Sequence, residues 1–274
     1  MTESILLLHP GEMGASVGAA LRANGHAVLW VSHGRSDATR QRAVAADLTS
    51  VATLEEALGS VDNVISVCPP NAAVDVARSV SSAGFNGVYV DANAVSPETA
   101  KCLADIAGDG FVDGGIIGPP ATRPGATRLY LSGELALTVA AWFEESLVDA
   151  RVVGCSASAL KMCYAAYTKG SSALILSIRA LASSHGAEDA LLSEWDISQS
   201  GLKARSHAAA RGTSRKAWRF EGEMREIAAT FAAAGLPSGF HQAASDVYRR
   251  MRDLKTVQDA DIERVIETLL ASCG

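Results

Sequence analysis

The spacing of hydrophobic positions changes along the chain and divides it into two parts. Up to about residue 155, short apolar runs typical of buried strands alternate with segments of helical spacing. From Ser156 onward, apolar residues recur at helical spacing almost without interruption. The alternating part predicts a doubly wound, largely parallel sheet, and the later part predicts an all-α domain. We therefore expect an α/β domain over residues 1–155 and an all-helical substrate and dimerisation domain over residues 156–274.

The first apolar run, Ile5 to Leu8, leads into a glycine-containing turn, a segment of helix formers and a second apolar run at residues 27–31. Strand, turn, helix and strand in this order form the unit that binds dinucleotides in Rossmann folds. Gly11 and Gly14 occupy the second and third glycine positions of G-x-G-x-x-G, whereas His9 stands at the first. An ordinary turn between a strand and a helix is the alternative. The turn residues expected to contact the cofactor are His9, Pro10, Gly11, Glu12, Met13 and Gly14.

The end of the second strand bears on the choice of cofactor. NAD sites usually have an acidic residue there for the ribose hydroxyls, but this chain has no carboxylate before Asp37. Ser32 and Arg35 suit a 2′-phosphate instead, because a guanidinium binds phosphate through two charge-assisted hydrogen bonds. We therefore expect NADP rather than NAD, with a solvated loop arginine as the alternative interpretation. Residues 43–48 are expected to form a short strand or a loop.

Two later strands end in residues that suit a ligand site. The apolar run at 63–68 stops at two prolines, and the run at 87–91 leads into a loop in which Ser96 is expected to cap a helix with Pro97 at its first position. The carboxyl ends of parallel strands lie at one edge of a sheet, so these loops should cluster with the glycine turn. The further residues expected at the cofactor are Cys68, Pro69, Pro70 and Asn93.

The long helix predicted over residues 156–184 carries one early charge, Lys161, on the same face as Tyr164 and Thr168. A lysine in apolar surroundings tends to have a lowered pKa, which suits acid/base work. A lysine that reaches the surface, or a structural ion pair, is the alternative. Lys169, on a neighbouring face, is a weaker candidate. Because this helix is apolar nearly all round, we expect it to pack against a second subunit in a homodimer.

Composition narrows the classes further. A net charge of −6 argues against a general nucleic-acid binder, and no apolar run approaches the ~20 residues of a membrane span. The six histidines and five cysteines lack zinc-site spacing, so no metal is expected. Scattered cysteines, including Cys273, fit reduced thiols, and we expect a cytoplasmic protein that acts on a small molecule.

Four segments, in order, resemble the β-hydroxyacid dehydrogenases and their relatives, the 6-phosphogluconate dehydrogenases and the imine reductases. Gly11 to Gly14 is similar to the family's cofactor loop, and residues 91–97 are similar to its D-x-S-T-x-x-P loop. Residues 154–164 are similar to its G-x-G-x-x-x-K-x-x-N segment, which places the catalytic lysine at Lys161. Residues 224–227, before Gly235-Leu236-Pro237, are similar to its Lys-Asp-Leu segment. The resemblance covers nearly the full length.

The resemblance implies a homodimeric oxidoreductase that moves hydride between NADP and a hydroxyl or carbonyl carbon of a 3-hydroxy acid or related alcohol, with Lys161 as general acid/base. The residues expected at the substrate are Asn93, Gly115, Ile117, Gly118, Tyr164 and Thr168. Ile117 stands where the family's substrate loop has a serine, and Tyr164 replaces its helix asparagine, so a bulkier, less anionic substrate is plausible. An imine reductase, or a catalytically silent NADP-binding sensor, is the alternative. Trp195, Arg225 and His241 are expected to be packing or surface residues rather than ligands.

Overall fold

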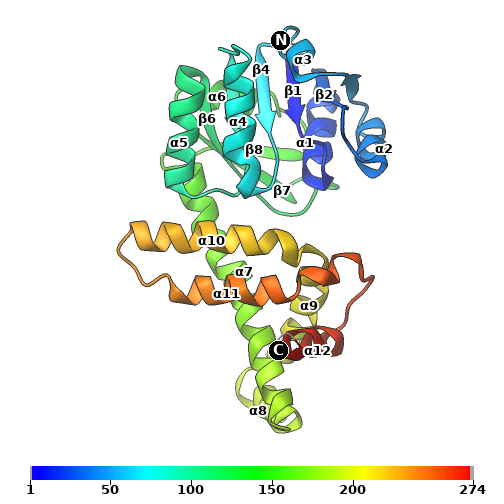
Figure 1. The fold of residues 1–274 in the computed structure, drawn as a ribbon, viewed down its shortest axis with the longest axis vertical. Coiled ribbons are helices and arrows are strands. Elements are labelled where there is room, and N and C mark those ends of the chain that lie inside the picture. The colour runs from blue at the N-terminus through cyan, green and yellow to red at the C-terminus, as the bar shows by residue number, and fades with distance from the viewer. Residues whose placement is uncertain (1, 272–274) are drawn as a thin grey trace. The chain divides into compact units, whose positions relative to one another are not determined.

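The computed structural model describes residues 2–271, so Cys273 lies outside the described residues. The chain forms two compact units, one ending at Met162 and the other beginning at Cys163. The first unit contains a sheet with helices on both faces, and the second is helical throughout its described part (Figure 1). The predicted fold class, a Rossmann-type domain followed by an all-helical region, is confirmed.

The sheet of the first unit has the strand order β3-β2-β1-β4-β5-β6-β7-β8. Neighbouring strands pair in parallel, except that β7 runs antiparallel to β6. The strands are β1 (Ser4–Leu8), β2 (Ala27–Val31), β3 (Thr49–Val51), β4 (Asn63–Ser66), β5 (Val88–Asp91), β6 (Phe111–Ile117), β7 (Thr127–Ser132) and β8 (Val148–Val152). The carboxyl ends of β2, β1, β4, β5 and β6 therefore follow one another along a single edge.

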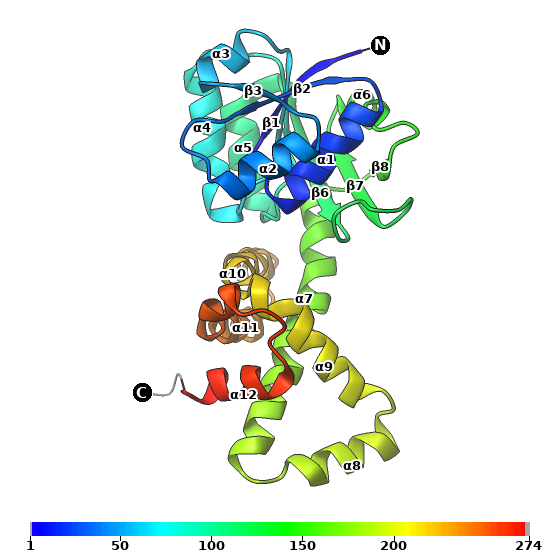
Figure 2. The ribbon, with the colours of Figure 1, turned by 90° about the vertical axis from the view of Figure 1, so that its right-hand side faces the viewer.

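Helices cover both faces of this sheet because alternate strand residues point to opposite sides. Ile5 and Leu7 pack in a core with α1, α2 and α6, whereas Leu6 and Leu8 pack in a second core with α3, α4 and α5. Figure 2 shows the same unit from a second side. The helical elements of this unit are α1 (Glu12–Ala23), α2 (Asp37–Ala45), α3 (Leu54–Leu58), η1 (Pro70–Ala72), α4 (Ala73–Ser82), α5 (Pro97–Ala107), η2 (Gly108–Gly110), α6 (Ala136–Ala141) and the first turns of α7 (Ala157–Ser184).

Several helix ends follow local signals in the sequence. Asn24 is the C-cap of α1, and Gly25 follows at φ 86°, a conformation that favours glycine. Thr53 caps α3, and Ser96 caps α5 with Pro97 in its first turn. The expectation of a strand or loop at residues 43–48 is wrong for residues 43–45, which end α2, whereas residues 46–48 form a loop. This helix buries only Ala43, so its sequence has no apolar periodicity to reveal it.

The second unit consists of helices throughout residues 163–271. Figures 1 and 2 both show α10 and α11 packed side by side. Its elements are the rest of α7, then α8 (Glu188–Ser198), α9 (Leu202–Thr213), η3 (Ser214–Lys216), α10 (Ala217–Ala233), α11 (Gly239–Arg250), η4 (Arg252–Thr256) and α12 (Ile262–Ala271).

Candidate active site

The turn between β1 and α1 is held close to the next strand. The backbone N–H of His9 donates to Val67 O at 3.3 Å, and Gly11 N donates to His9 O at 2.8 Å. A Cβ on Gly14 would lie 2.1 Å from His9 O, so only glycine fits where α1 meets this turn. A Cβ on Gly11 would meet no described atom within 4 Å. The turn thus combines a tight contact at Gly14 with an open backbone at Gly11, as a pyrophosphate site needs.

Arg35, beyond the end of β2, carries a half-buried charge that faces this turn. Its Nε is buried and has no hydrogen-bond partner among the described residues. Burial lowers the pKa of the guanidinium. Burial, and then the charge of Arg35, lower the pKa of His9 to about 4. At neutral pH the site therefore pairs a cationic arginine with an uncharged imidazole, and both groups would gain from an anion bound nearby.

A second arginine, Arg42 on α2, lies at the same turn. Its Nε donates to Pro10 O at 3.3 Å, and its Nη2 donates to Thr39 Oγ1 at 3.1 Å. Sequence reasoning missed Arg42 because it missed the helix that carries it; the signal was Ser36, whose side chain caps α2 by accepting from Thr39 N. Ser32 is engaged by β3, since its hydroxyl donates to Val51 O at 3.1 Å. Two guanidinium groups therefore meet the glycine turn at the β2 end of the site.

Asn93 joins the ends of β4 and β5. Its Oδ1 accepts from Cys68 N at 2.5 Å, and its Nδ2 donates to Ser66 Oγ at 3.1 Å and to Asp91 Oδ1 at 2.5 Å. Both amide hydrogens are thereby used inside the protein, so Asn93 holds the Cys68 turn in place. Burial raises the pKa of the Cys68 thiol to about 12, which keeps it protonated. Pro69 and Pro70 follow directly, and Pro70 is buried at the start of η1.

Lys161 lies against the end of β6. Its Nζ donates to Ile116 O at 2.6 Å, and the lysine is half-buried. A Cβ on Gly115 would come within 2.9 Å of Ala157 O and 3.0 Å of Lys161 Cβ, so glycine lets α7 approach β6 closely. Ile117 is only 3% exposed, which removes its side chain from direct reach of a ligand. Gly118 is exposed at φ 121°.

The structure thus brings most of the predicted cofactor residues to one edge of the sheet. Along that edge lie the Arg35 loop after β2, the glycine turn after β1, the Cys68 turn after β4, Asn93 after β5 and Lys161 against β6. Three strand spacings separate β1 from β6, or about 14 Å at ~4.8 Å per strand. An extended dinucleotide lies across the carboxyl edge of such sheets. Glu12 is exposed and Met13 half-buried at the start of α1.

The remaining candidates lie in the second unit. Tyr164 is 46% exposed, and the hydroxyl of Thr168 donates to Tyr164 O at 3.2 Å. Lys169 forms an ion pair with the buried Glu223, and its Nζ lies 4.9 Å from the centroid of the Phe220 ring. This pairing favours a structural role for Lys169.

Three further residues of this unit take packing or surface positions. Trp195 and His241 are buried at 7% and 6% exposure, and Arg225 is exposed and paired with Glu221. Residue 241 packs against the ring of Phe231, with centroids 4.2 Å apart.

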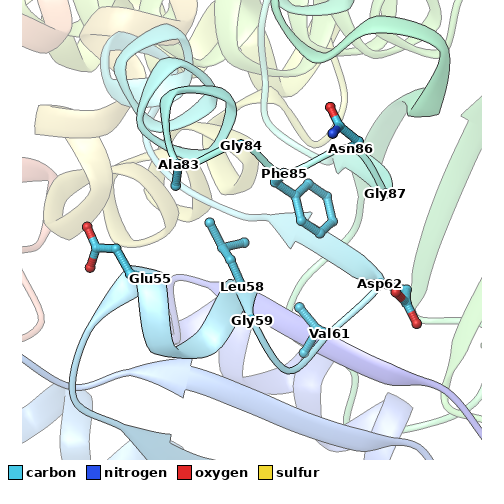
Figure 3. Close-up of a pocket in the computed structure, with 10 residues that line it drawn as sticks. All are labelled: Glu55, Leu58, Gly59, Val61, Asp62, Ala83, Gly84, Phe85, Asn86 and Gly87. Atoms are coloured by element: carbon cyan, nitrogen blue, oxygen red, sulfur yellow. The ribbon is translucent and has the colours of Figure 1, made fainter.

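A pocket of about 540 Å³ lies at the amino ends of β4 and β5, the opposite edge from the glycine turn. Figure 3 shows Glu55 and Asp62 at its two ends, with Leu58, Val61 and Phe85 between them. Doubly wound sheets bind their ligands outside the carboxyl ends of the strands. The position of this pocket therefore separates it from the candidate active site.

Among residues 2–271, no three His, Cys, Asp or Glu side chains are grouped as metal ligands would be. Within the same residues, every helix is too short or too polar to cross a membrane.

Comparison with known proteins gives two sequence matches. A protein family described as a domain of unknown function (DUF1932) matches residues 182–251. An uncharacterized 28.5 kDa protein of Methanothermus fervidus is 33% identical over 163 residues, which cover 58% of this chain and 63% of that protein. The match therefore spans less than two thirds of that relative's length.

Three solved structures are similar over most of their lengths. A conserved protein of unknown function, described as structurally similar to 3-hydroxyacid dehydrogenases, is 25% identical with a TM-score of 0.64, over 93% of this chain and 100% of that chain. A 3-hydroxyisobutyrate dehydrogenase of Mycobacterium tuberculosis is 18% identical with a TM-score of 0.71, over 98% of this chain and 99% of that chain. A Streptomyces aurantiacus imine reductase is 22% identical with a TM-score of 0.50, over 97% and 99%. The chain has the fold of 3-hydroxyacid dehydrogenases and imine reductases, as its motifs predicted.

Proposed function

We propose that this protein is an NADP-dependent oxidoreductase that transfers hydride between the nicotinamide and a hydroxyl or carbonyl carbon of a small molecule related to 3-hydroxy acids. The observation that carries the proposal is the arrangement along one sheet edge: an arginine-flanked glycine turn at one end and Lys161 at the other. The fold shared with dehydrogenases and reductases supports this class of reaction. Fold alone does not specify chemistry, so the residues must carry the argument.

The residues of the glycine turn fit NADP. The open backbone at Gly11 and the N-terminus of α1 suit the pyrophosphate. Arg35 and Arg42 suit a 2′-phosphate: Arg35 carries a half-buried charge whose Nε has no hydrogen-bond partner among the described residues, and Arg42 lies at the glycine turn, where its Nε donates to Pro10 O. A bound nicotinamide would supply hydride chemistry. His9, Ser32 and the Cys68–Pro70 turn would shape the same site.

Lys161 would hold and move the proton at the substrate oxygen. In the oxidation direction the substrate hydroxyl gives its proton to Lys161 while hydride leaves the same carbon, and reduction runs in reverse. The bond from Nζ to Ile116 O keeps the amine at the carboxyl edge of β6. A positioned acid/base of this kind typically contributes 10²–10⁴-fold to the rate.

The substrate is proposed to be less anionic than a simple hydroxy acid. The buried Ile117 offers no hydroxyl, and both amide hydrogens of Asn93 are engaged by Ser66 and Asp91. Gly115, Gly118 and the groups on α7, Tyr164 and Thr168, remain the proposed substrate contacts. These residues would contact the substrate through backbone groups, a phenol and a hydroxyl, and none of them carries a positive charge that would bind a carboxylate.

Imine reduction is the second candidate, because an imine reductase shares the fold. The run Asp113-Gly114-Gly115-Ile116 is similar to the imine reductase pattern, but packing explains both glycines. A Cβ on Gly114 would lie 2.7 Å from Asp91 O, and one on Gly115 would strike α7. The presence of Lys161 argues against imine reduction, because this residue matches the catalytic lysine of the hydroxyacid dehydrogenase motif. A silent NADP-binding sensor would retain the cofactor contacts and lack turnover.

The chain is further proposed to act as a cytoplasmic homodimer. Three exposed apolar residues of α7 recur at a spacing of seven, which places them along one stripe: Tyr167, Leu174 and Leu181. A second copy that covers this stripe would remove it from water. The unpaired thiols Cys102, Cys155 and Cys163 are exposed, which suits a reducing compartment.

The test is nicotinamide absorbance across 3-hydroxy acids, simple alcohols and cyclic imines, with NADP and NAD in both redox states and Lys161→Ala as the control. We expect turnover of a hydroxy or carbonyl compound with NADP(H), reduced at least 10²-fold in the variant. Turnover of imines alone would favour the reductase. Tight NADPH binding without turnover anywhere would favour the sensor.

A further inference from the structure

Asp113 on β6 is a carboxylate that no step of the proposed reaction uses, yet it makes an unusual number of contacts. It is 8% exposed and accepts hydrogen bonds from Ser132 Oγ at 3.1 Å, Ser156 Oγ at 2.9 Å and Ser158 N at 3.1 Å. The hydroxyl of Ser158 also donates to its Oδ1. A single buried side chain thus ties β7 and the start of α7 to β6.

These contacts satisfy the free N–H groups of the first helical turn. Ser132 Oγ accepts from Ala157 N at 3.0 Å, Asp113 accepts from Ser158 N, and Ser156 Oγ accepts from Ala159 N at 3.1 Å. Helix N-termini leave such donors unpaired and carry a partial positive charge, so a carboxylate there is favourable. The register of α7 against the sheet is therefore fixed at its first turn.

Lys161 lies one turn further along the same helix and two positions beyond the capped Ala159. Its Cβ packs against Gly115, which is two residues after Asp113 on β6, and its Nζ reaches Ile116 O. One strand therefore supplies the helix anchor at Asp113, the close contact at Gly115 and the hydrogen-bond acceptor at Ile116. Any shift of the first turn of α7 would move the amine relative to the strand end.

We infer that Asp113 is the positioning residue for Lys161: it holds the first turn of α7 on β6, so that the amine is placed at the carboxyl edge of the sheet. This inference rests on the role proposed for Lys161 but concerns a different residue. Its test requires a measurement of Lys161 that does not depend on turnover.

Two substitutions disturb the same geometry by different physical means. Asp113→Asn puts an amide nitrogen at one of the two oxygen positions, which accept from Ser158 Oγ and from Ser158 N respectively, so at least one hydrogen bond that the carboxylate accepts is lost. Gly115→Ala removes no hydrogen bond, but its Cβ would lie 2.9 Å from Ala157 O and push α7 away. Asp149→Asn is the matched control, because Asp149 is a carboxylate on β8 that pairs with Arg151.

The readout is the rate at which acetic anhydride acetylates Lys161 in the full-length protein, followed by peptide mass spectrometry and normalised to Lys101. We expect Asp113→Asn and Gly115→Ala each to raise this rate about tenfold, because the amine loses its bond to Ile116 O, while NADPH affinity stays within twofold. Circular dichroism at the assay temperature confirms that each variant is folded. The control should match the wild type. Unchanged Lys161 acetylation in a folded Asp113→Asn protein would overturn the inference and leave Asp113 a stability residue.

Turnover separates this inference from the proposed function. Where the wild type turns over a substrate from the panel, kcat should fall about 10²-fold in Asp113→Asn with KM little changed, since misplacing a catalytic group by ~1 Å costs about that much. A wild type without turnover would refute the proposed function. The acetylation result would still decide whether Asp113 positions Lys161.

Discussion

Replacing Arg35 with serine should weaken the binding of NADPH much more than the binding of NADH. Arg35 is half-buried with a buried Nε that has no partner in residues 2–271, and burial lowers its pKa. The free protein therefore bears the cost of a poorly solvated cation. A cofactor phosphate beside the guanidinium would compensate this half-buried charge, so the substitution should weaken NADPH binding while leaving the free protein unharmed.

The size of the effect follows from one charged contact. A hydrogen bond between charged groups contributes about 1.5–3 kcal/mol, which corresponds to a roughly 10- to 100-fold weaker NADPH affinity. NADH lacks the 2′-phosphate, so its affinity should change less than about threefold. Because an unsatisfied buried group costs about 1–3 kcal/mol, the free Arg35→Ser protein should melt at the same temperature as the wild type or a few degrees higher.

The assay is isothermal titration of each cofactor into wild type, Arg35→Ser and Arg151→Ser, with a thermal melt of each free protein. Arg151 is the control because it is an exposed arginine on β8 that changes the net charge equally. The Arg42→Ser variant and the double variant extend the experiment. Two arginines that share one phosphate should show a coupling energy of at least about 0.5 kcal/mol.

Equal losses for NADPH and NADH in Arg35→Ser would exclude a contact between Arg35 and the 2′-phosphate, since they would place the arginine at the pyrophosphate or outside the site. A lower melting temperature of the free variant would equally contradict the view that its charge is poorly satisfied. An equal loss of NADPH affinity in Arg151→Ser would indicate a general electrostatic effect rather than a specific contact by Arg35.

Three further predictions concern the turn and the long helix. The contribution of His9 should lower the unfolding free energy by about 3 kcal/mol as the pH drops from 7 to 4, because its pKa is lowered from 6.5 to about 4 and the unfolded chain binds the proton first. Urea titrations at each pH should show a smaller fall in the unfolding free energy for His9→Gln than for the wild type. An equal fall in both proteins would contradict the lowered pKa of His9. Gly14→Ala should destabilise the protein by more than about 2 kcal/mol, because its Cβ would meet His9 O at 2.1 Å. Gly11→Ala should keep the melting temperature of the wild type and lose NADPH affinity. A stable Gly14→Ala protein, or a destabilised Gly11→Ala protein, would contradict these roles of the two glycines. Leu174→Asp should convert a dimer to a monomer in sedimentation experiments, because the side chain is 47% exposed on the proposed dimer stripe; a wild type that sediments as a monomer would reject the dimer.

Much of the fold was predictable because local chemistry fixed it. Mostly apolar runs identified β1, β2, β4 and β5, since strands inside a parallel sheet are covered by helices on both faces. Ser96 with Pro97 marked the start of α5 through side-chain capping, which involves only neighbouring residues. Helix α2 was not predicted, because it lies on the surface and buries a single residue, so its sequence shows no helical spacing of apolar residues.

The sequence by itself therefore determined the order of most elements, α2 excepted, together with the glycine turn and the lysine on a long helix. Only the tertiary structure decided which polar groups meet. It brought Arg42 to Pro10 across 32 positions and placed Asp113 beneath Ser158 across 45 positions. It also committed the amide of Asn93 to protein partners rather than leaving it free for a ligand. The spacing of residues along the chain predicts a single helix or strand. These contacts depend instead on how helices and strands pack against one another, which no local sequence pattern encodes.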